Sequence, residues 1–363
     1  MNSGCSMSRR QFMESTALAA GGLLAGCASA NPALAARNDQ MIWAYLIHLG
    51  MNSWKDVPLE RAPADASRAF KVRCMADYLR TDEKVWRTVT DALGRSGANM
   101  LIIDMAEGVY LPSHPELAVR GTWSVEKFQK ELARLRAMGL EPIPKMNFST
   151  CHDSWLKGYQ RMVSTEKYYQ VCADVIRDVI EIFSVDGKPP RFFHLGYDEE
   201  TPNHQRSFEL AIVRQGELWW HDFLWFAKQV ESKGVRPWIW SDYCWHHKDE
   251  FLNRMPKSVL QSNWYYGAEF DVSKMSESGR PHVQTYVDLA KAGFDQVPAG
   301  ANWSNDTNFG DTVKFCRANC PAEHLKGFMM ASWQRTIPEE MEKGLRAVDQ
   351  LDAEAKKWKP GQA

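Results

Sequence analysis

Hydrophobic segments of eight to ten residues alternate with amphipathic segments along most of the chain. The hydrophobic segments are rich in β-branched and aromatic residues, which is typical of buried strands, and the segments between them repeat apolar residues at helical spacing. We expect strands at residues 41–50, 98–105, 140–148, 191–199, 235–244, 259–267, 295–303 and 325–334. A helix or helical turn should follow each strand, and the last helix should span residues 337–358.

The order of these elements predicts the fold class. Alternating strands and helices predict a parallel sheet, and eight repeats in roughly 325 residues predict a single α/β domain, a (β/α)8 TIM barrel. An open, doubly wound sheet is the alternative, but no G-x-G-x-x-G motif follows the first strand. Two long inserts, residues 52–82 and 106–123, follow strands and should therefore lie above the C-terminal ends of the strands.

The first 36 residues resemble an export signal. The segment SRRQFM resembles a twin-arginine signal, and the apolar stretch after it is too short to span a membrane as a mature helix. LAGC resembles a lipobox with Cys27 as the acylated residue, and ordinary cleavage after ASA or ALA is the alternative. We expect an exported protein, either periplasmic or anchored to the membrane as a lipoprotein, whose catalytic domain spans residues 37–363.

The net charge and the cysteine spacing give no reason to expect a nucleic-acid partner or a metal site. The net charge of −1 gives no reason to expect a nucleic-acid partner. The six cysteines after Cys27 are irregularly spaced and form no C-x-x-C pair, so we expect no metal and mostly free, buried thiols. His246 and His247 are adjacent, and adjacent histidines rarely bind one ion together. We also expect no cofactor.

Polar and aromatic residues gather where the predicted strands end, which is where (β/α)8 barrels place their active sites. The fifteen Trp residues are many for this length, and indoles at four strand ends suit the C–H faces of a sugar. The candidate substrate-binding residues are Asp104, His152, His194, Trp240, Asp242, Trp264, Tyr265, Trp303 and Trp333.

The segment RFFHLGYDEE, residues 191–200, supplies the candidate catalytic acids, Asp198 and Glu199. Because side chains alternate along a strand, His194 and Asp198 should face the same side, with Glu199 at the start of the loop. Adjacent carboxylates repel, so the second of them should be harder to ionise. Such a pair can hold one anion and one proton donor at neutral pH, as cleavage of a glycosidic bond requires.

This segment resembles the H-x-G-x-D-E motif of glycoside hydrolase family 20, the β-N-acetylhexosaminidases and their relatives. Residues 121–155, which end near His152, are also similar to that family, and the likeness covers roughly residues 97–340. The resemblance implies a retaining, substrate-assisted hydrolysis of N-acetylated glycans, in which the sugar's own acetamido oxygen attacks its anomeric carbon. Glu199 would then be the acid and base, and Asp198 would orient the acetamido group.

Two further implications of the resemblance stay open. A family tyrosine binds the acetamido carbonyl, and Tyr243, Tyr265 and Tyr266 are its candidates. The arginine that strand one usually supplies to the family's sugar site has no counterpart in IWAYLIHLGMNSW. The alternatives are a glycosidase with Asp104 or Asp242 as its nucleophile, and a non-catalytic sugar-binding lipoprotein. The natural glycan, its linkage and the oligomeric state are left open.

Overall fold

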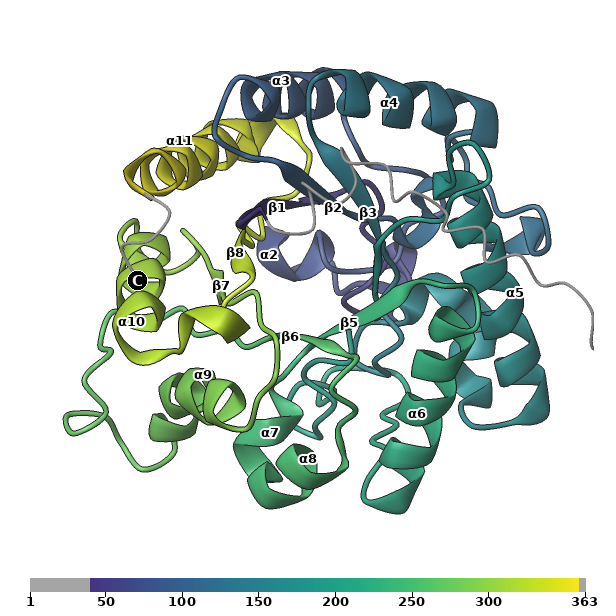
Figure 1. Cartoon of the computed structure of the whole chain (residues 1–363). Coiled ribbons are helices and arrows are strands. Elements are labelled where there is room, and N and C mark those ends of the chain that lie inside the picture. The colour runs from purple at the N-terminus through teal and green to yellow at the C-terminus, as the bar shows by residue number, and fades with distance from the viewer. Residues whose placement is uncertain (1–39, 359–363) are drawn as a thin grey trace, which may run out of the picture. The chain divides into compact units, whose positions relative to one another are not determined.

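The computed structural model describes residues 40–358. The signal-like residues 1–36 and Cys27 lie outside the described residues. Eight parallel strands form one sheet in the order β6-β5-β4-β3-β2-β1-β8-β7, drawn in Figure 1. The strands are β1 (Ile42–His48), β2 (Met100–Asp104), β3 (Glu141–Lys145), β4 (Phe192–His194), β5 (Arg236–Trp240), β6 (Leu260–Ser262), β7 (Ala299–Gly300) and β8 (Gly327–Met330).

The sheet closes between β6 and β7 through single bridges. Gln261 is bridged to Gln296 and Trp264 to Ala299, both in the parallel sense. The backbone N–H of Ala299 donates to the carbonyl of Asn263 at 2.9 Å. These contacts complete the ring, so the predicted (β/α)8 TIM barrel is confirmed.

Helices cover the outside of the barrel (Figure 1). Side-chain caps start four of them, since each cap residue accepts a hydrogen bond from a backbone N–H in the first turn. The cap residues are Ser67, Asp82, Ser124 and Thr165. No helix between residues 40 and 358 is long and apolar enough to cross a bilayer. The α-helices are α2 (Arg68–Lys71), α3 (Glu83–Gly94), α4 (Val125–Ala137), α5 (Glu166–Phe183), α6 (Glu217–Glu231), α7 (Tyr243–His246), α8 (Lys248–Arg254), α9 (Arg280–Lys291), α10 (Asn308–Asn319) and α11 (Met341–Lys357).

Short 3-10 helices complete the connections between these elements. Two of them, η2 and η3, lie in the insert at residues 106–123, and η1 lies in the insert at residues 52–82. The 3-10 helices are η1 (Leu59–Arg61), η2 (Ala106–Gly108), η3 (Pro115–Leu117), η4 (Ser154–Met162), η5 (Ala322–His324) and η6 (Pro338–Glu340).

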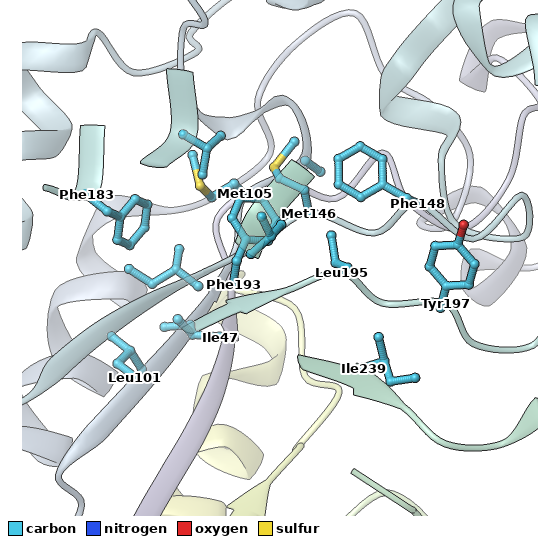
Figure 2. Packing of buried hydrophobic residues seen from close by; sticks show 14 of the residues in the cluster. Ile47, Leu101, Met105, Met146, Phe148, Phe183, Phe193, Leu195, Tyr197 and Ile239 are labelled. Atoms are coloured by element: carbon cyan, nitrogen blue, oxygen red, sulfur yellow. The ribbon is translucent and has the colours of Figure 1, made fainter. Parts of the chain in front are cut away.

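Alternate strand positions divide the core into two clusters. Ala44 and Leu46 of β1 face the barrel interior and pack with residues such as Trp238. Their neighbours Tyr45 and Ile47 face outward and pack against the helices. Figure 2 shows part of this outer cluster, where side chains from several strands meet. Every residue of β1 and β2 is buried, as expected for parallel strands covered on both sides.

The strand that leads to the candidate catalytic acids is shorter than predicted. β4 ends at His194, and the backbone then turns through positive φ values at Gly196 (75°), Tyr197 (73°) and Glu199 (58°). Strand alternation therefore does not reach Asp198, although Asp198 does face the same end of the barrel. A Cβ on Gly196 would lie 1.9 Å from Oδ1 of Asn147, so this position requires glycine.

We expect Gly196→Ala to destabilise the protein more than an ordinary glycine replacement. Gly234 has a similar φ of 74° but nothing within 4 Å of an added Cβ, so Gly234→Ala should cost only about 1–2 kcal/mol for the left-handed backbone. Gly196→Ala must also displace Asn147, and should cost at least twice as much. Urea unfolding of both variants measures the difference. Equal losses would contradict the close contact.

Candidate active site

A cavity of about 410 Å³ lies at the C-terminal ends of the strands. Two carboxylates from the loop after β4 share it with aromatic side chains that follow β1, β6, β7 and β8. The cavity therefore brings acids and indoles together, as the sequence predicted. Its lining is Trp54, Lys55, Arg73, Cys151, His152, Asp198, Glu199, His204, Trp264, Tyr266, Trp303, Trp333 and Arg335.

Asn147, which follows β3, holds Asp198 in place. Its Nδ2 donates to Oδ1 of Asp198 at 2.7 Å, while its Oδ1 accepts the backbone N–H of Ser149 and of Tyr197. The hydroxyl of Ser149 also donates to the carbonyl of Asp198, at 2.5 Å. Both the side chain and the backbone of Asp198 are therefore fixed from β3, and one Asp198 oxygen remains for a ligand or for His152.

Glu199 lies between two histidines. Its Oε2 is 3.2 Å from Nε2 of His152, and its Oε1 is 3.3 Å from Nε2 of His204. Its backbone N–H donates to Oδ2 of Asp242 at 2.8 Å. These contacts hold the left-handed backbone of Glu199 so that its carboxyl group points into the cavity.

His152 is surrounded by hydrogen-bond acceptors. Its Nδ1 lies 3.0 Å from the carbonyl of Ser53, and its Nε2 also lies 3.4 Å from Oδ2 of Asp198. Both ring nitrogens must donate, which only the protonated imidazolium can do. Burial alone would lower the pKa of His152, but the carboxylates of Asp198 and Glu199 raise it to about 9.

The sequence predicted that one of the two neighbouring acids would hold a proton, but in the structure the histidines beside Glu199 hold it. Burial alone would raise the pKa of Glu199, but hydrogen bonds from His152 and His204 hold it well below its usual range. Glu199 raises the pKa of His204 in return. The expectation that Glu199 is hard to ionise was wrong, because the hydrogen bonds from two imidazoles outweigh the effect of burial. Burial and Asp198 raise the pKa of Asp242 instead, to about 7.

Six of the predicted site residues line the cavity. They are Asp198, Glu199, His152, Trp264, Trp303 and Trp333. Asp242 lies directly behind them, bonded to the Glu199 backbone and 3.4 Å from Nε1 of Trp264.

Three other predicted residues lie beneath the cavity rather than in it. Trp240 is buried, with its ring centroid 5.7 Å from that of Trp333. His194 packs against Trp240, and burial and Lys145 lower its pKa well below the usual value, so it is neutral. Asp104 is bonded to Lys145 at 2.7 Å inside the barrel. None of the three has the access that direct contact with a sugar requires.

The choice of Tyr265 is corrected to Tyr266. Tyr265 packs against Phe270, at 5.2 Å between ring centroids, and does not line the cavity. Tyr266 does line it and stacks on Trp264 at 5.0 Å. Neighbouring residues in an extended segment face opposite sides, so a shift of one residue changes which tyrosine is available.

Sequence reasoning missed several members of the site. Asn147 was visible at the end of strand three, but nothing marked it as the partner of Asp198. His204 belongs to the loop after Glu199, and Lys55 and Arg73 come from the insert at residues 52–82. The spacing of these residues gives no motif, and only the folded loops bring them to the cavity. The insert at residues 106–123 contributes no residue to the cavity lining.

Glu200, the third acid of the segment, is structural. Its Oε1 accepts from Nε of Arg214 at 2.7 Å, and the same guanidinium binds Asp222 at 3.1 Å. This buried network lies beside a second cavity of about 420 Å³, which shares Glu199 and His204 with the first. Glu199 therefore forms part of the wall between two cavities.

One group of the described residues could hold a metal ion. The ligand atoms of Cys151, His152 and Glu199 lie within 4.8 Å of one another. However, burial and Glu199 raise the pKa of the Cys151 thiol, and His152 carries a proton on each nitrogen. The protonation of both groups competes with metal binding, so this geometry favours proton transfer.

Comparison with known proteins defines the class. Residues 142–348 match the description "Glycosyl hydrolase family 20, catalytic domain", which is more than half of the chain. The chain belongs to glycosyl hydrolase family 20, a family of glycoside hydrolases, and the resemblance drawn from the H-x-G-x-D-E motif is confirmed. No curated protein matches the chain.

Solved structures support the fold. The chain is similar to the family 20 β-N-acetylhexosaminidase of Streptomyces coelicolor A3(2), with a TM-score of 0.56 and 13% identity over 89% of this chain and 65% of that one. For a mutant Streptomyces plicatus β-hexosaminidase in complex with its product GlcNAc, the TM-score is 0.55 and the sequence identity is 13%, over 86% of this chain and 64% of that one. For Dispersin B, the TM-score is 0.51 and the sequence identity is 14%, over 76% of this chain and 95% of that one. The chain thus spans slightly less than two thirds of the Streptomyces enzymes.

We expect the His152 imidazolium to make stability depend on pH. The folded-state pKa of about 9 is above the unfolded value of 6.5, so the stabilisation is complete below pH 6.5 and is lost as pH rises through 9. Asp242, whose pKa is also raised, to about 7, adds its own loss of stability as pH rises through 7. Urea unfolding between pH 7 and 9.5 should show a loss on the order of 1–3 kcal/mol, and His152→Gln should flatten that slope. An identical slope in the variant would contradict this protonation state.

Proposed function

We propose that this protein is a retaining glycoside hydrolase that cleaves β-linked 2-acetamido sugars with the help of the substrate's own acetamido group. The observation that carries the proposal is the joint placement of Asp198 and Glu199 in a cavity walled by Trp264, Tyr266 and Trp333. Indole and phenol rings cover the C–H faces of a pyranose, and the acids supply the polar chemistry. Membership of glycosyl hydrolase family 20 supports the same reaction.

In the first step the acetamido carbonyl oxygen attacks the anomeric carbon. The bond from that carbon to the leaving oxygen breaks, and the proton of the Glu199 carboxyl group passes to the leaving oxygen. The resulting oxazolinium ion carries positive charge, which the Asp198 carboxylate stabilises. Asn147 matters here because its hydrogen bond leaves Asp198 one free oxygen to hold the acetamido N–H.

In the second step Glu199 acts as a base. It takes a proton from a water molecule whose oxygen attacks the anomeric carbon and opens the oxazolinium ring, so two inversions retain the configuration. Glu199 is ionised in the free protein, while His152 and His204 carry protons beside it. We infer that these imidazoles supply the proton that Glu199 needs when a bound sugar excludes water from the cavity.

The alternative with a protein nucleophile is less well supported. Asp104 is paired with Lys145 inside the barrel and does not line the cavity. Asp242 accepts the Glu199 backbone N–H, and its pKa of about 7 leaves it partly protonated at neutral pH. Neither carboxylate is placed as a free nucleophile. Export by the twin-arginine route, with lipid on Cys27 as one form of anchoring, remains part of the proposal.

We expect Glu199→Gln to lower kcat/KM by about 10²–10⁴-fold on a chitobiose-type disaccharide. The loss should be much smaller on a 2,4-dinitrophenyl glycoside, whose leaving group departs without protonation. Steady-state kinetics on both substrates measures the two losses. Glu60→Gln, which changes an exposed acid outside the cavity, is the control and should leave both values unchanged. Equal losses on the two substrates would exclude Glu199 as the acid, and binding without turnover by the unaltered protein would indicate a sugar-binding protein.

Hydrolysis should require the 2-acetamido group. A glycoside with a 2-hydroxyl group should not be cleaved, and a thiazoline analogue of the oxazolinium ion should inhibit competitively. Asp198→Asn should weaken that inhibitor by about tenfold or more, because the variant loses a charge-assisted hydrogen bond. Inhibition constants for the two proteins test this. Covalent labelling of Asp242 by a 2-fluoro sugar would instead establish the protein-nucleophile mechanism.

A further inference from the structure

Two cations in the cavity wall have no carboxylate partner. Lys55 and Arg73 both come from the insert at residues 52–82 and both line the cavity. Neither forms an ion pair with any residue between 40 and 358. The third cation of the wall, Arg335, is different, because its Nε donates to Oε1 of Glu340 at 2.8 Å. The positive charge of the other two is therefore uncompensated.

The surroundings of Lys55 make this arrangement costly. Its side chain is only 8% exposed, and its ammonium group lies 4.8 Å from the ring centroid of Phe70 and 5.9 Å from that of Phe208. Its hydrogen bond goes to the hydroxyl of Ser207, a neutral group. Burial lowers the pKa of Lys55, and the charge of Arg73 lowers it further. A nearly buried ammonium without a counter-ion is unfavourable in a protein.

The nearest acid in the sequence does not relieve this cost. Asp56 is buried, but its Oδ1 accepts the backbone N–H of Glu209 at 2.7 Å and its Oδ2 that of Leu210 at 2.9 Å. Asp198 and Glu199, which also line the cavity, are already paired with His152 and His204. The cavity lining thus contains acids that already have cationic partners and two cations that have no acidic partner.

We propose that the substrate carries an anionic substituent, a sulfate, phosphate or carboxylate group, which binds to Lys55 and Arg73. This inference rests on the proposed function, because it specifies the substrate class of the same site. A bound anion would neutralise both cations at once, and ammonium and guanidinium groups both form strong hydrogen bonds to such oxygens. A neutral N-acetylated sugar would leave both cations without an anionic partner.

Binding to the Glu199→Gln variant tests the inference without hydrolysis. Calorimetry would compare N-acetylglucosamine with its 6-sulfate, its 6-phosphate and N-acetylmuramic acid, which carries a lactyl carboxylate. At least one anionic sugar should bind about tenfold or more tightly than the neutral sugar, and the advantage should shrink as salt rises. Comparison of the three anionic sugars identifies the source of the charge.

Substitutions in the same background localise the effect. Arg73→Gln should remove most of the preference, and because Arg73 is exposed the change leaves the fold intact. Lys55→Met keeps the aliphatic packing between the two rings and should act in the same direction. Arg95→Gln removes an equivalent charge from an exposed position outside the cavity and should preserve the preference.

The outcomes separate the inference from the function on which it rests. Equal or weaker binding of all three anionic sugars, or a preference that survives both Arg73→Gln and Lys55→Met, overturns the inference. Hydrolysis of neutral and anionic glycosides by the unaltered protein is measured separately. Tighter anion binding without any hydrolysis would refute the proposed function and retain the anion site. Rapid hydrolysis without a preference for anionic sugars would support the proposed function and refute the anion site.

Discussion

The hydrogen bonds of Asn147 hold the turn after β4, and the placement of both candidate acids depends on them. One amide side chain accepts the N–H groups of Ser149 and Tyr197 and donates to Asp198. This is feasible only because Gly196 has no side chain where Asn147 lies. The left-handed residues that follow turn Glu199 toward the cavity at an energetic cost that the surrounding hydrogen bonds offset. Local backbone geometry, rather than strand alternation, thus positions the chemistry.

The same turn brings several carboxylates together, and two histidines pair with them. The effect is visible at Asp242, whose pKa is raised to about 7 by burial and by the charge of Asp198. His152 and His204 instead keep Glu199 ionised and hold the protons themselves. Buried Glu200 is matched in a different way, by the permanent charge of Arg214. The candidate acid Glu199 therefore has titratable partners, whereas Glu200 is paired with a guanidinium that stays charged.

How far the sequence could predict this structure follows from the range of the interactions. Strand and helix periodicity depends on neighbours in the chain, so eight strands, the barrel and the indoles at its rim were predictable. The direction of a side chain at the end of a short strand could not be predicted in this way, which is why Tyr265 was chosen in place of Tyr266. The protonation of Glu199 depends on His152 and on His204, whose loop path no pattern encodes. The position of Lys55 and Arg73 in the cavity lining could not be predicted either, because it depends on the path of the insert at residues 52–82.

The seam between β6 and β7 gives the barrel an uneven mechanical character. β1 and β2 are joined over five consecutive residue pairs, whereas β6 and β7 meet only through single bridges. Trp264, Tyr266 and Trp303 follow directly from that seam, while Asp198 and Glu199 follow β4, two strands away from β6. The strands that lead to the candidate acids are no better joined, since β3 and β4 share the single pair Lys145 and His194. The Asn147 side chain, however, bonds to Asp198 and to the backbone of Tyr197 there. Side-chain hydrogen bonds thus hold the turn with the candidate acids where the strand ladder is short, whereas the indoles at the rim follow strands that isolated bridges join.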